Sequence, residues 1–232
     1  MEIVNRVGKE DYHMHSWDYS DGADSVEQII EYAKELGLER IAITDHSQAC
    51  LNELNKKRKD KLPHVPREEY YSFAEQELDE KEIDVIFGIE GDLLNEEGYI
   101  CQDIQGISTD FLILAAHIMV YSSEPENLTE GMIKAIERYD KNIKFIAHPY
   151  LKEYENLDIE KLIEVANDYE IPLELNCGCI IKDKINLDLL EKVLQESQQI
   201  YINSDSHNLN ELGTSTSKGL DYLKRVGISI PK

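Results

Sequence analysis

Positive charge is scarce in this 232-residue chain, which has 24 Lys and Arg against 47 Asp and Glu and a formal net charge of −23. Such a field repels nucleic-acid backbones, and tight non-specific binding depends on Lys and Arg that release counterions from phosphates. No stable binding to nucleic acid is therefore expected. A small phosphorylated substrate fits this charge better than a long polyanion, provided that bound divalent metals supply local positive charge.

Long apolar runs are also missing, since no stretch approaches the roughly 18 to 20 residues that a membrane span requires. The first few residues of the chain include charged side chains, and no signal peptide is recognised there. The four cysteines, Cys50, Cys101, Cys177 and Cys179, show no framework spacing. The last two are separated by one residue, whereas redox and zinc motifs have two, which favours a buried strand end. The sequence predicts a cytoplasmic protein with reduced thiols and no membrane association.

No Gly-x-Gly-x-x-Gly fingerprint follows a predicted strand, and no repeat, low-complexity tract or linker is found. A Rossmann-type nucleotide-binding fold therefore has no support. Barrels of alternating strands and helices form single domains of roughly 200 to 250 residues. We therefore expect residues 1–232 to form one domain.

Short apolar runs alternate with amphipathic stretches along the whole chain. Seven runs are predicted as strands, at residues 11–15, 40–46, 83–90, 111–117, 143–148, 171–176 and 199–205. Helical patterns lie between them, at about 24–37, 67–81, 128–140, 158–170 and 186–198. This alternation implies parallel strands joined by crossover helices. The expected fold is α/β, a closed or nearly closed seven-stranded barrel.

Three local features refine this layout. In the first helix, Asp24 is expected as the N-cap with Glu27 three residues on, and Gly37 as the end. Residues 47–66 carry a basic cluster and are interpreted either as a solvated loop or short helix, or as a flap that meets substrate phosphate. The cluster consists of Lys56, Lys57, Arg58, Lys59 and Lys61. Residues 91–110 are expected to contain a small hairpin arm.

Histidines gather at one end of the predicted barrel. His13 and His15 are two residues apart, so an extended chain directs both to the same side. Six of the seven histidines follow strand ends, where barrel enzymes build their active sites. They are His13, His15, His46, His117, His148 and His207, and they are accompanied by Asp21, Glu90 and Asp205. The exception is His64, in the basic insertion. This set of imidazoles and carboxylates indicates a polynuclear metal site.

These residues resemble the motifs of the PHP (polymerase and histidinol phosphatase) superfamily of metal-dependent phosphoesterases. The matching pieces occur in the family's order from residue 11 to residue 207. They are His13-x-His15 with Ser20-Asp21-Gly22, Ile43-Thr44-Asp45-His46, Gly88-Ile89-Glu90, Ala116-His117, Ala147-His148-Pro149 and Asn203-Ser204-Asp205-Ser206-His207. The resemblance implies a distorted seven-stranded (β/α)7 barrel, similar to a TIM barrel, that holds up to three metals.

The resemblance also implies which residues bind those metals. One ion would be held by His13, His15, Glu90 and Asp205. A second would be held by Asp21, His46 and His207, and a third by Glu90, His117 and His148. Asp21 stands where the family often has His, and this harder ligand favours manganese or iron over zinc. Two to three divalent ions, Zn, Mn or Fe, are the expected cofactors.

The expected chemistry is hydrolysis of a small phosphomonoester at this trinuclear site. A water that bridges two such ions has its pKa lowered from 15.7 towards about 7, which provides hydroxide near neutral pH. Glu90, Asp205 and His207 are the candidate catalytic residues. The general acid is either a metal-bound water or His207. Asp45 either fixes the tautomer of a ligand or caps a turn.

Substrate contacts are expected from basic side chains near the barrel mouth: Lys152, Lys182 and Arg58. The two lysines are also compatible with ordinary surface positions. Histidinol phosphate is the leading substrate implied by the resemblance. One alternative is a phosphodiesterase or exonuclease acting on nucleotides, similar to the PHP modules of bacterial DNA polymerases. Another is a non-catalytic metal-binding module, which is disfavoured because all nine ligand positions are filled. The oligomeric state is left open.

Overall fold

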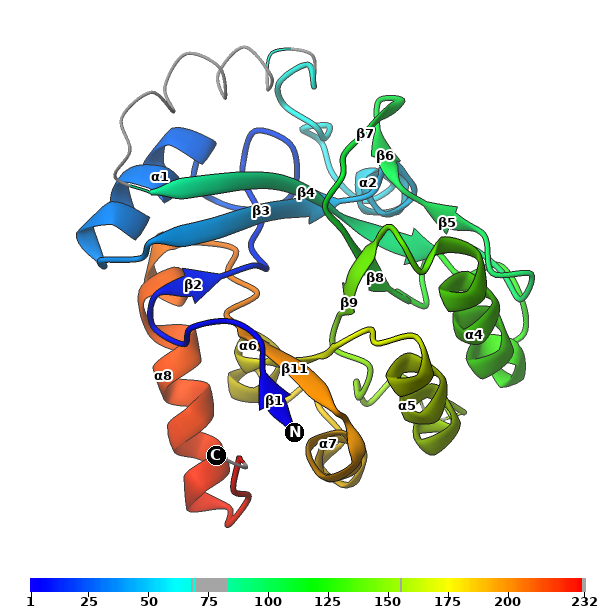
Figure 1. Cartoon of the computed structure of the whole chain (residues 1–232). Helices are drawn as coiled ribbons and strands as arrows, with labels where there is room; N and C mark the ends of the chain where they lie inside the picture. The colour runs from blue at the N-terminus through cyan, green and yellow to red at the C-terminus, as the bar shows by residue number, and fades with distance from the viewer. Residues whose placement is uncertain (68, 70–82, 155, 231–232) are drawn as a thin grey trace.

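A single curled sheet dominates the computed structural model, which describes residues 1–67, 69, 83–154 and 156–230 (Figure 1). Its strands follow the order β1-β11-β10-β9-β8-β4-β3-β2, and each pairing along this path is parallel. The strands are β1 Glu2–Ile3, β2 Glu10–Asp11, β3 Arg40–His46, β4 Asp84–Leu93, β8 Leu112–Ala115, β9 Ile143–Ile146, β10 Leu173–Asn176 and β11 Gln199–Asn203. The parallel α/β barrel expected from the sequence is confirmed, with β1 as an additional short strand.

The barrel closes between the segment after β2 and the segment after β11. An isolated parallel bridge joins Met14 to Ser206, and the His15 N–H donates to the Ser206 carbonyl at 2.9 Å. The expectation of a strand over 11–15 is wrong in detail, because regular pairing ends at Asp11. After Asp11 the chain leaves the sheet, and the residues that follow lie at the end of the barrel.

Helices lie around the outside of this sheet (Figure 1). They are α1 Val26–Glu35, α2 Gln48–Asn55, the 3₁₀ turn η1 Pro125–Asn127, α4 Leu128–Tyr139, α5 Ile159–Asp168, α6 Cys177–Ile181, α7 Leu187–Glu196 and α8 Leu209–Arg225. Their apolar faces and the outer face of the sheet form two buried clusters. Burial of such amphipathic faces, rather than intrinsic helix propensity, supplies most of the stability of short helices.

A separate aromatic cluster fills the inside of the barrel. Tyr201 packs edge-on against Tyr12, with ring centroids 5.4 Å apart, and stacks on Phe145 at 4.7 Å. Phe111 stacks on Tyr12, with ring centroids 5.8 Å apart. Together with small residues such as Ala42, these rings plug the interior. The histidines at the carboxyl ends of the strands therefore have a packed apolar layer beneath them.

Several local expectations can be compared with the structure. The N-cap of α1 is Ser25, not Asp24, because Ser25 and Gln28 form a reciprocal capping box. Gly37 follows the helix end with a φ of 72°, as its expected role requires. The pair around Gly178 does not end a strand, because β10 stops at Asn176 and the short helix α6 begins at Cys177.

The two interruptions of the strand–helix alternation also have defined structures. The insertion after β3 begins with the short helix α2, in agreement with one of the two interpretations of residues 47–66. The arm contains β5 Ile100–Cys101, antiparallel to β4, and a small hairpin of β6 Asp103–Ile104 and β7 Ile107–Ser108. The helix expected over 67–81 lies mostly outside the described residues. Among the helices that the structure describes, none has the length and apolar character needed to cross a membrane.

Candidate metal centre

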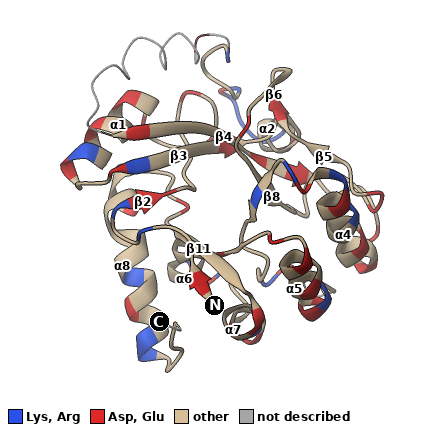
Figure 2. Ribbon diagram, in the orientation of Figure 1, with Lys and Arg blue, Asp and Glu red and all other residues tan. Residues whose placement is uncertain are grey.

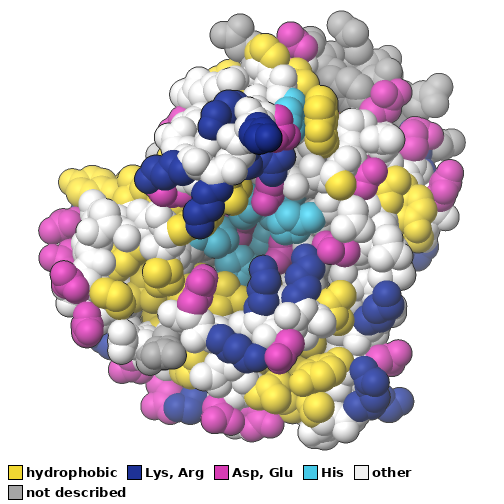
Figure 3. All heavy atoms as spheres, turned by 180° about the vertical axis from the view of Figure 1, so that it is seen from behind, with side chains coloured by type: hydrophobic (Ala, Val, Ile, Leu, Met, Phe, Trp, Pro, Cys, Tyr) yellow, Lys and Arg dark blue, Asp and Glu magenta, His cyan; other side chains and the backbone are white. Residues whose placement is uncertain are grey.

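The carboxyl ends of the strands converge on a hollow whose bottom is lined by histidines (Figure 3). The side chains arrive there from several strand ends; β3 ends at His46 and β4 carries Glu90. Metal-ligating atoms within 4.8 Å of one another form several groups in the described residues. Three of them are His15, Asp21, His46 and His207; His13, His15 and Glu90; and Glu90, His117 and His148. A fourth joins His13, His148 and Asp205. All nine residues singled out in the sequence thus lie together.

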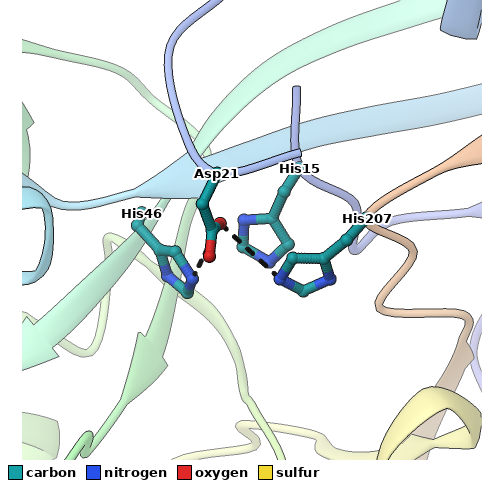
Figure 4. A group of neighbouring side chains, drawn as sticks. All are labelled: His15, Asp21, His46 and His207. Atoms are coloured by element: carbon teal, nitrogen blue, oxygen red, sulfur yellow. Dashed lines mark ion pairs between the residues drawn. The ribbon is translucent and has the colours of Figure 1, made fainter. Parts of the chain in front are cut away.

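Asp21 reaches the hollow from the loop after His15. Its Oδ1 lies 3.5 Å from His46 Nε2 and 3.7 Å from His207 Nε2, and the carboxylate points toward both rings (Figure 4). The loop returns this closely because residue 22 is glycine: a Cβ there would lie 2.2 Å from the His15 carbonyl oxygen. The Ser-Asp-Gly sequence therefore has a steric reason, which is close backbone approach.

Glu90 occupies the middle of the cluster and is fully buried. Its Oε1 lies 2.8 Å from His148 Nε2, 3.5 Å from His13 Nε2 and 3.8 Å from His117 Nε2. Its Oε2 lies 2.7 Å from His46 Nδ1 and 3.6 Å from His15 Nε2. The two oxygens therefore face two different sets of imidazoles. This geometry suits a carboxylate that is shared between two cations.

The carboxylates of the cluster are held in their charged form. Burial alone would raise the pKa of Glu90, but the charges of His117, His13 and His46 outweigh burial and hold the pKa well below its usual value. The pKa of Asp21 falls to about 2 in the same way, because burial is outweighed by His46, His207 and His15. Negative charge is thus fixed at the largely buried floor of the hollow, where it attracts cations more strongly than in bulk water.

The pKa values of the imidazoles shift in opposite directions. Burial lowers the pKa of His117, but the carboxylates Glu90 and Asp92 outweigh burial and raise it to about 10. The pKa of His13 is also raised, since its carboxylate neighbours outweigh burial. By contrast, burial and the neighbouring His46 and His207 lower the pKa of His15 to about 3. Without an added cation, protons on some of the rings balance the buried carboxylates.

The donor atoms fit divalent metals. Within the part of the chain that the structure describes, His13 Nε2 and both ring nitrogens of His15 are buried without a hydrogen-bond partner. Unpartnered buried nitrogens are costly unless a ligand takes their lone pairs. Imidazole and carboxylate together suit zinc, manganese and iron. The residues present therefore fit divalent metal ions.

A second layer of carboxylates holds the rings, and sequence reasoning missed it. Asp92 Oδ1 lies 2.7 Å from His117 Nδ1, and Glu174 Oε1 lies 2.9 Å from His13 Nδ1. Both carboxylates are fully buried. Two signals were present in the sequence: Asp92 is two residues after Glu90 on the same strand face, and Glu174 is the one charge in an apolar strand.

Asp45 does not have the suggested role of fixing a ligand ring. Its carboxylate accepts from the Ser16 N–H at 2.6 Å and from the Ser16 hydroxyl at 3.0 Å. Burial raises the pKa of Asp45 to about 6, against the opposing effect of Arg67 and the Ser16 hydrogen bonds. Asp45 thus anchors the loop that starts after His15, which agrees with the alternative role in a turn.

Basic side chains flank the hollow on two sides, and one group lies over the segment that follows α2 (Figure 3). This contrasts with the acidic residues distributed along the surrounding helices (Figure 2). The cavity has a volume of about 510 Å³, and Lys152 and Lys184 line it. Lys184 was missed because its position depends on a bridge between Leu151 and Ile185, which brings its loop to the mouth.

The other candidate substrate contacts do not line this cavity. Lys182 is paired with Glu211 at 3.0 Å, and Arg58 with Asp60 at 3.0 Å. His64 stacks on Trp17, with ring centroids 4.2 Å apart, and is absent from the ligand groups formed by the described residues. The structure therefore separates these side chains from the floor of the hollow.

One buried thiol also approaches the cluster. Cys50, in the first turn of α2, has its sulfur within 4.8 Å of ring nitrogens of His46 and His117. All four cysteines are free. The sequence did not place Cys50 near the histidines. The direction in which α2 leaves the end of β3 decides which of its side chains face them, and that direction cannot be read from the sequence.

A family model matches most of the chain: residues 11–211 match the PHP domain. The chain belongs to the PHP domain family. The match begins at the first predicted strand and extends beyond His207, so it contains the whole cluster of candidate ligands. The family resemblance inferred from the sequence motifs is thereby confirmed.

Relatives of this PHP chain differ in length and in described activity. The chain is 30% identical over 232 residues to the DNA polymerase/3′-5′ exonuclease PolX of Bacillus subtilis, covering 94% of this chain but only 38% of PolX. It is 25% identical over 210 residues to a probable phosphatase of Proteus mirabilis, covering 88% of this chain and 80% of the relative. The PHP chain thus resembles part of PolX and most of a stand-alone protein.

Solved structures share the fold. Histidinol phosphate phosphatase from Lactococcus lactis, complexed with zinc, L-histidinol and phosphate, superposes with a TM-score of 0.61 at 18% identity, covering 96% of this chain and 95% of the other. A putative histidinol phosphatase from Listeria monocytogenes gives a TM-score of 0.59 at 14% identity, covering 90% and 99%. At these identities the likeness establishes the architecture of the PHP chain.

Proposed function

We propose that this PHP protein is a metal-dependent phosphoesterase that hydrolyses a small phosphomonoester, with histidinol phosphate as the leading substrate. The observation that carries the proposal is the buried carboxylate of Glu90, which faces His148, His13 and His117 with one oxygen and His46 and His15 with the other. Family membership and the probable phosphatases among the relatives support the same reaction class.

Two to three divalent ions, Zn, Mn or Fe, would be held by the nine residues expected from the sequence. Glu90 would serve two of the ions. The remaining ligands are His13, His15, Asp21, His46, His117, His148, Asp205 and His207. When bound, the ions would stabilise charge on the phosphate oxygens and make a coordinated water acidic enough to act near neutral pH.

The chain's own side chains would hold and orient the substrate. Glu90 and Asp205 stay charged because their pKa values lie well below the usual range: burial opposes ionisation, but the surrounding histidines outweigh it. His207, one of the candidate ligands, is 27% exposed and lines the cavity, so its ring would lie next to a bound substrate. Lys152 and Lys184 would attract the anionic substrate at the mouth.

The size of the cavity supports a small substrate. At about 510 Å³, it falls within the roughly 300–1,000 Å³ typical of small-molecule sites. The related fold that binds L-histidinol and phosphate supports an amino alcohol phosphate in particular. The overall charge of −23 disfavours a long polyanion.

A phosphodiesterase or exonuclease is the second candidate. It is favoured by the 30% identity to PolX, although this chain covers only 38% of that protein. The basic side chains beside the hollow are also compatible with a nucleotide (Figure 3).

The two candidates can be separated with chromogenic esters. Metal-loaded protein should turn over p-nitrophenyl phosphate faster than bis-p-nitrophenyl phosphate, and histidinol phosphate faster than either. Faster turnover of the diester would replace the monoesterase proposal with the second candidate. If the chromogenic diester is hydrolysed about as fast as the monoester and no phosphate is released from histidinol phosphate, histidinol phosphate is rejected as the substrate.

A further inference from the structure

Glu174 lies beneath the cluster, on β10, and is not one of the nine candidate ligands. We propose that Glu174 is a positioning residue that fixes the ring tautomer of His13, the backbone of His148 and, through Asn176, the carboxylate of Asp205, so that the centre is preorganised for a divalent metal. The inference rests on the proposed metal-dependent function. The hydrogen bonds around Glu174 carry it.

The carboxylate of Glu174 accepts four hydrogen bonds, two on each oxygen. Oε1 accepts from His13 Nδ1 at 2.9 Å and from Asn203 Nδ2 at 2.9 Å. Oε2 accepts from the His148 backbone N–H at 3.0 Å and from Asn176 Nδ2 at 3.0 Å. Only an ionised carboxylate offers two oxygens that accept and do not donate. An amide in this place would set an NH₂ group against donors.

The two asparagines cannot turn to accommodate such an amide. Asn203 Oδ1 accepts from the Tyr12 N–H at 3.0 Å, and Asn176 Oδ1 accepts from the Cys179 N–H at 2.8 Å. A backbone donor therefore fixes each side-chain carbonyl, and the NH₂ groups are left facing Glu174. The position requires a carboxylate for reasons of hydrogen bonding and not only of size.

The same arrangement decides which nitrogen of His13 can bind a metal. Because Nδ1–H donates to Glu174, Nε2 is the nitrogen that offers a lone pair to the centre. It lies 3.5 Å from Glu90 Oε1 and 3.6 Å from Asp205 Oδ1. The ring is thus turned into the group of ligands by a contact made on its opposite side.

Glu174 also supports two ligands whose backbone is unusual. His148 has a φ of 31° and Asp205 a φ of 50°, both in the left-handed region that non-glycine residues rarely occupy. Glu174 binds the His148 N–H directly, and Asn176 Nδ2 links it to Asp205 Oδ2 at 3.1 Å. Such strain persists where the surroundings hold it in place. One carboxylate therefore organises ligands from three strand ends.

Asp92 provides a matched comparison, because it binds the ring of a single candidate ligand. Its Oδ1 contacts His117 Nδ1 at 2.7 Å, and its Oδ2 accepts from the Ser47 hydroxyl at 2.5 Å. A serine hydroxyl can rotate and donate or accept. Asp92→Asn should therefore disturb one ligand, whereas Glu174→Gln should disturb three.

The first test compares metal binding by wild type, Glu174→Gln and Asp92→Asn, using metal-stripped protein and Zn²⁺ in competition with a chromogenic chelator. Removal of such supporting groups typically weakens metal binding by roughly 10- to 100-fold. We expect the loss of Zn²⁺ affinity in Glu174→Gln to reach or exceed the upper end of this range, and the loss in Asp92→Asn to lie near its lower end. Wild-type affinity in a folded Glu174→Gln variant would overturn the positioning role while leaving the proposed function intact.

The second test needs no Glu174 variant, so it stands even if Glu174→Gln fails to fold. Long-range ¹H–¹⁵N spectra of the zinc-loaded wild type, with His13 assigned by its loss in His13→Gln, should show a proton on Nδ1 and none on Nε2. A proton on Nε2 would overturn the proposal. A wild-type chain that binds no divalent metal would overturn both this inference and the proposed function.

Discussion

The floor and the rim of the hollow are built on different principles. On the floor, His13 and Glu90 are fully buried, and neighbouring groups hold each from several sides. On the rim, the side chain of Lys152 is 54% exposed and pairs with Asp183 at 2.9 Å. Exposed ion pairs of this kind typically contribute only about 0–1 kcal/mol. Under the proposed function, the floor would determine the type of reaction and the rim would determine substrate preference.

The largest effect is expected from breaking the floor at its centre. Glu90→Gln keeps the size of the side chain but removes the charge that faces five imidazoles. Removal of one preorganised charge-stabilising group costs about 10²–10³-fold in kcat, and we expect at least this loss. Steady-state kinetics and elemental analysis of the same preparation would measure activity and bound metal together.

His64→Ala is the matched control for Glu90→Gln. This ring stacks on Trp17 outside the ligand groups, and its removal should leave activity unchanged. Near-normal turnover of a folded Glu90→Gln variant would show that the assignment of Glu90 is wrong. A large loss in His64→Ala would show that the insertion closes over the floor.

The second prediction concerns competition between protons and metals on the floor. The pKa of His117 is raised to about 10, since Glu90 and Asp92 outweigh burial, and the pKa of His46 is raised well above 6.5 by neighbours that also outweigh burial. These rings therefore keep their protons at neutral pH until an ion displaces them. Metal affinity should rise with pH, and loading should release protons.

Adding Zn²⁺ or Mn²⁺ to metal-free protein in weakly buffered solution at neutral pH would measure this release. The raised pKa of His117 also affects the stability of the metal-free protein. The stabilising contribution of the charged ring is complete below pH 6.5 and is lost as the pH rises through about 10. Metal uptake without proton release, or affinity that falls with rising pH, would contradict this description of the floor.

A smaller effect is expected at the rim. Lys152→Ala and Lys184→Ala should each raise KM roughly 5-fold, the equivalent of about 1 kcal/mol for an exposed charged contact, with kcat nearly unchanged. Lys182→Ala is the matched control, because this lysine pairs with Glu211 and does not line the cavity. Equal effects in all three variants would remove the distinction between lining and surface lysines.

The smallest effect is expected for the basic cluster after α2. Neutralising Lys56, Lys57, Arg58 and Lys59 together should raise KM about 2- to 3-fold at low ionic strength, because the cluster acts at long range and is screened by salt. The effect should disappear at high salt. An unchanged KM at low salt would mean that the cluster is an ordinary solvated segment.

The same contrast explains how much could be inferred from sequence. The floor was predictable because His46 and His148 each follow an apolar run, and strand ends in a parallel barrel must meet. Glu174 was not, because nothing in an apolar strand says which ring its lone carboxylate will contact. Lys184 depends on how two loops pair, and Ser25 replaced Asp24 as the helix cap through a hydrogen bond with Gln28.

The most direct test of the central claim is the metal content of protein purified without a metal-affinity tag, determined by elemental analysis. The nine converging donors predict two to three divalent ions per chain, together with phosphate release from a preferred monoester such as histidinol phosphate. Protein that contains no metal and gains no activity on addition of manganese, zinc or iron would contradict the account and point to a non-catalytic module.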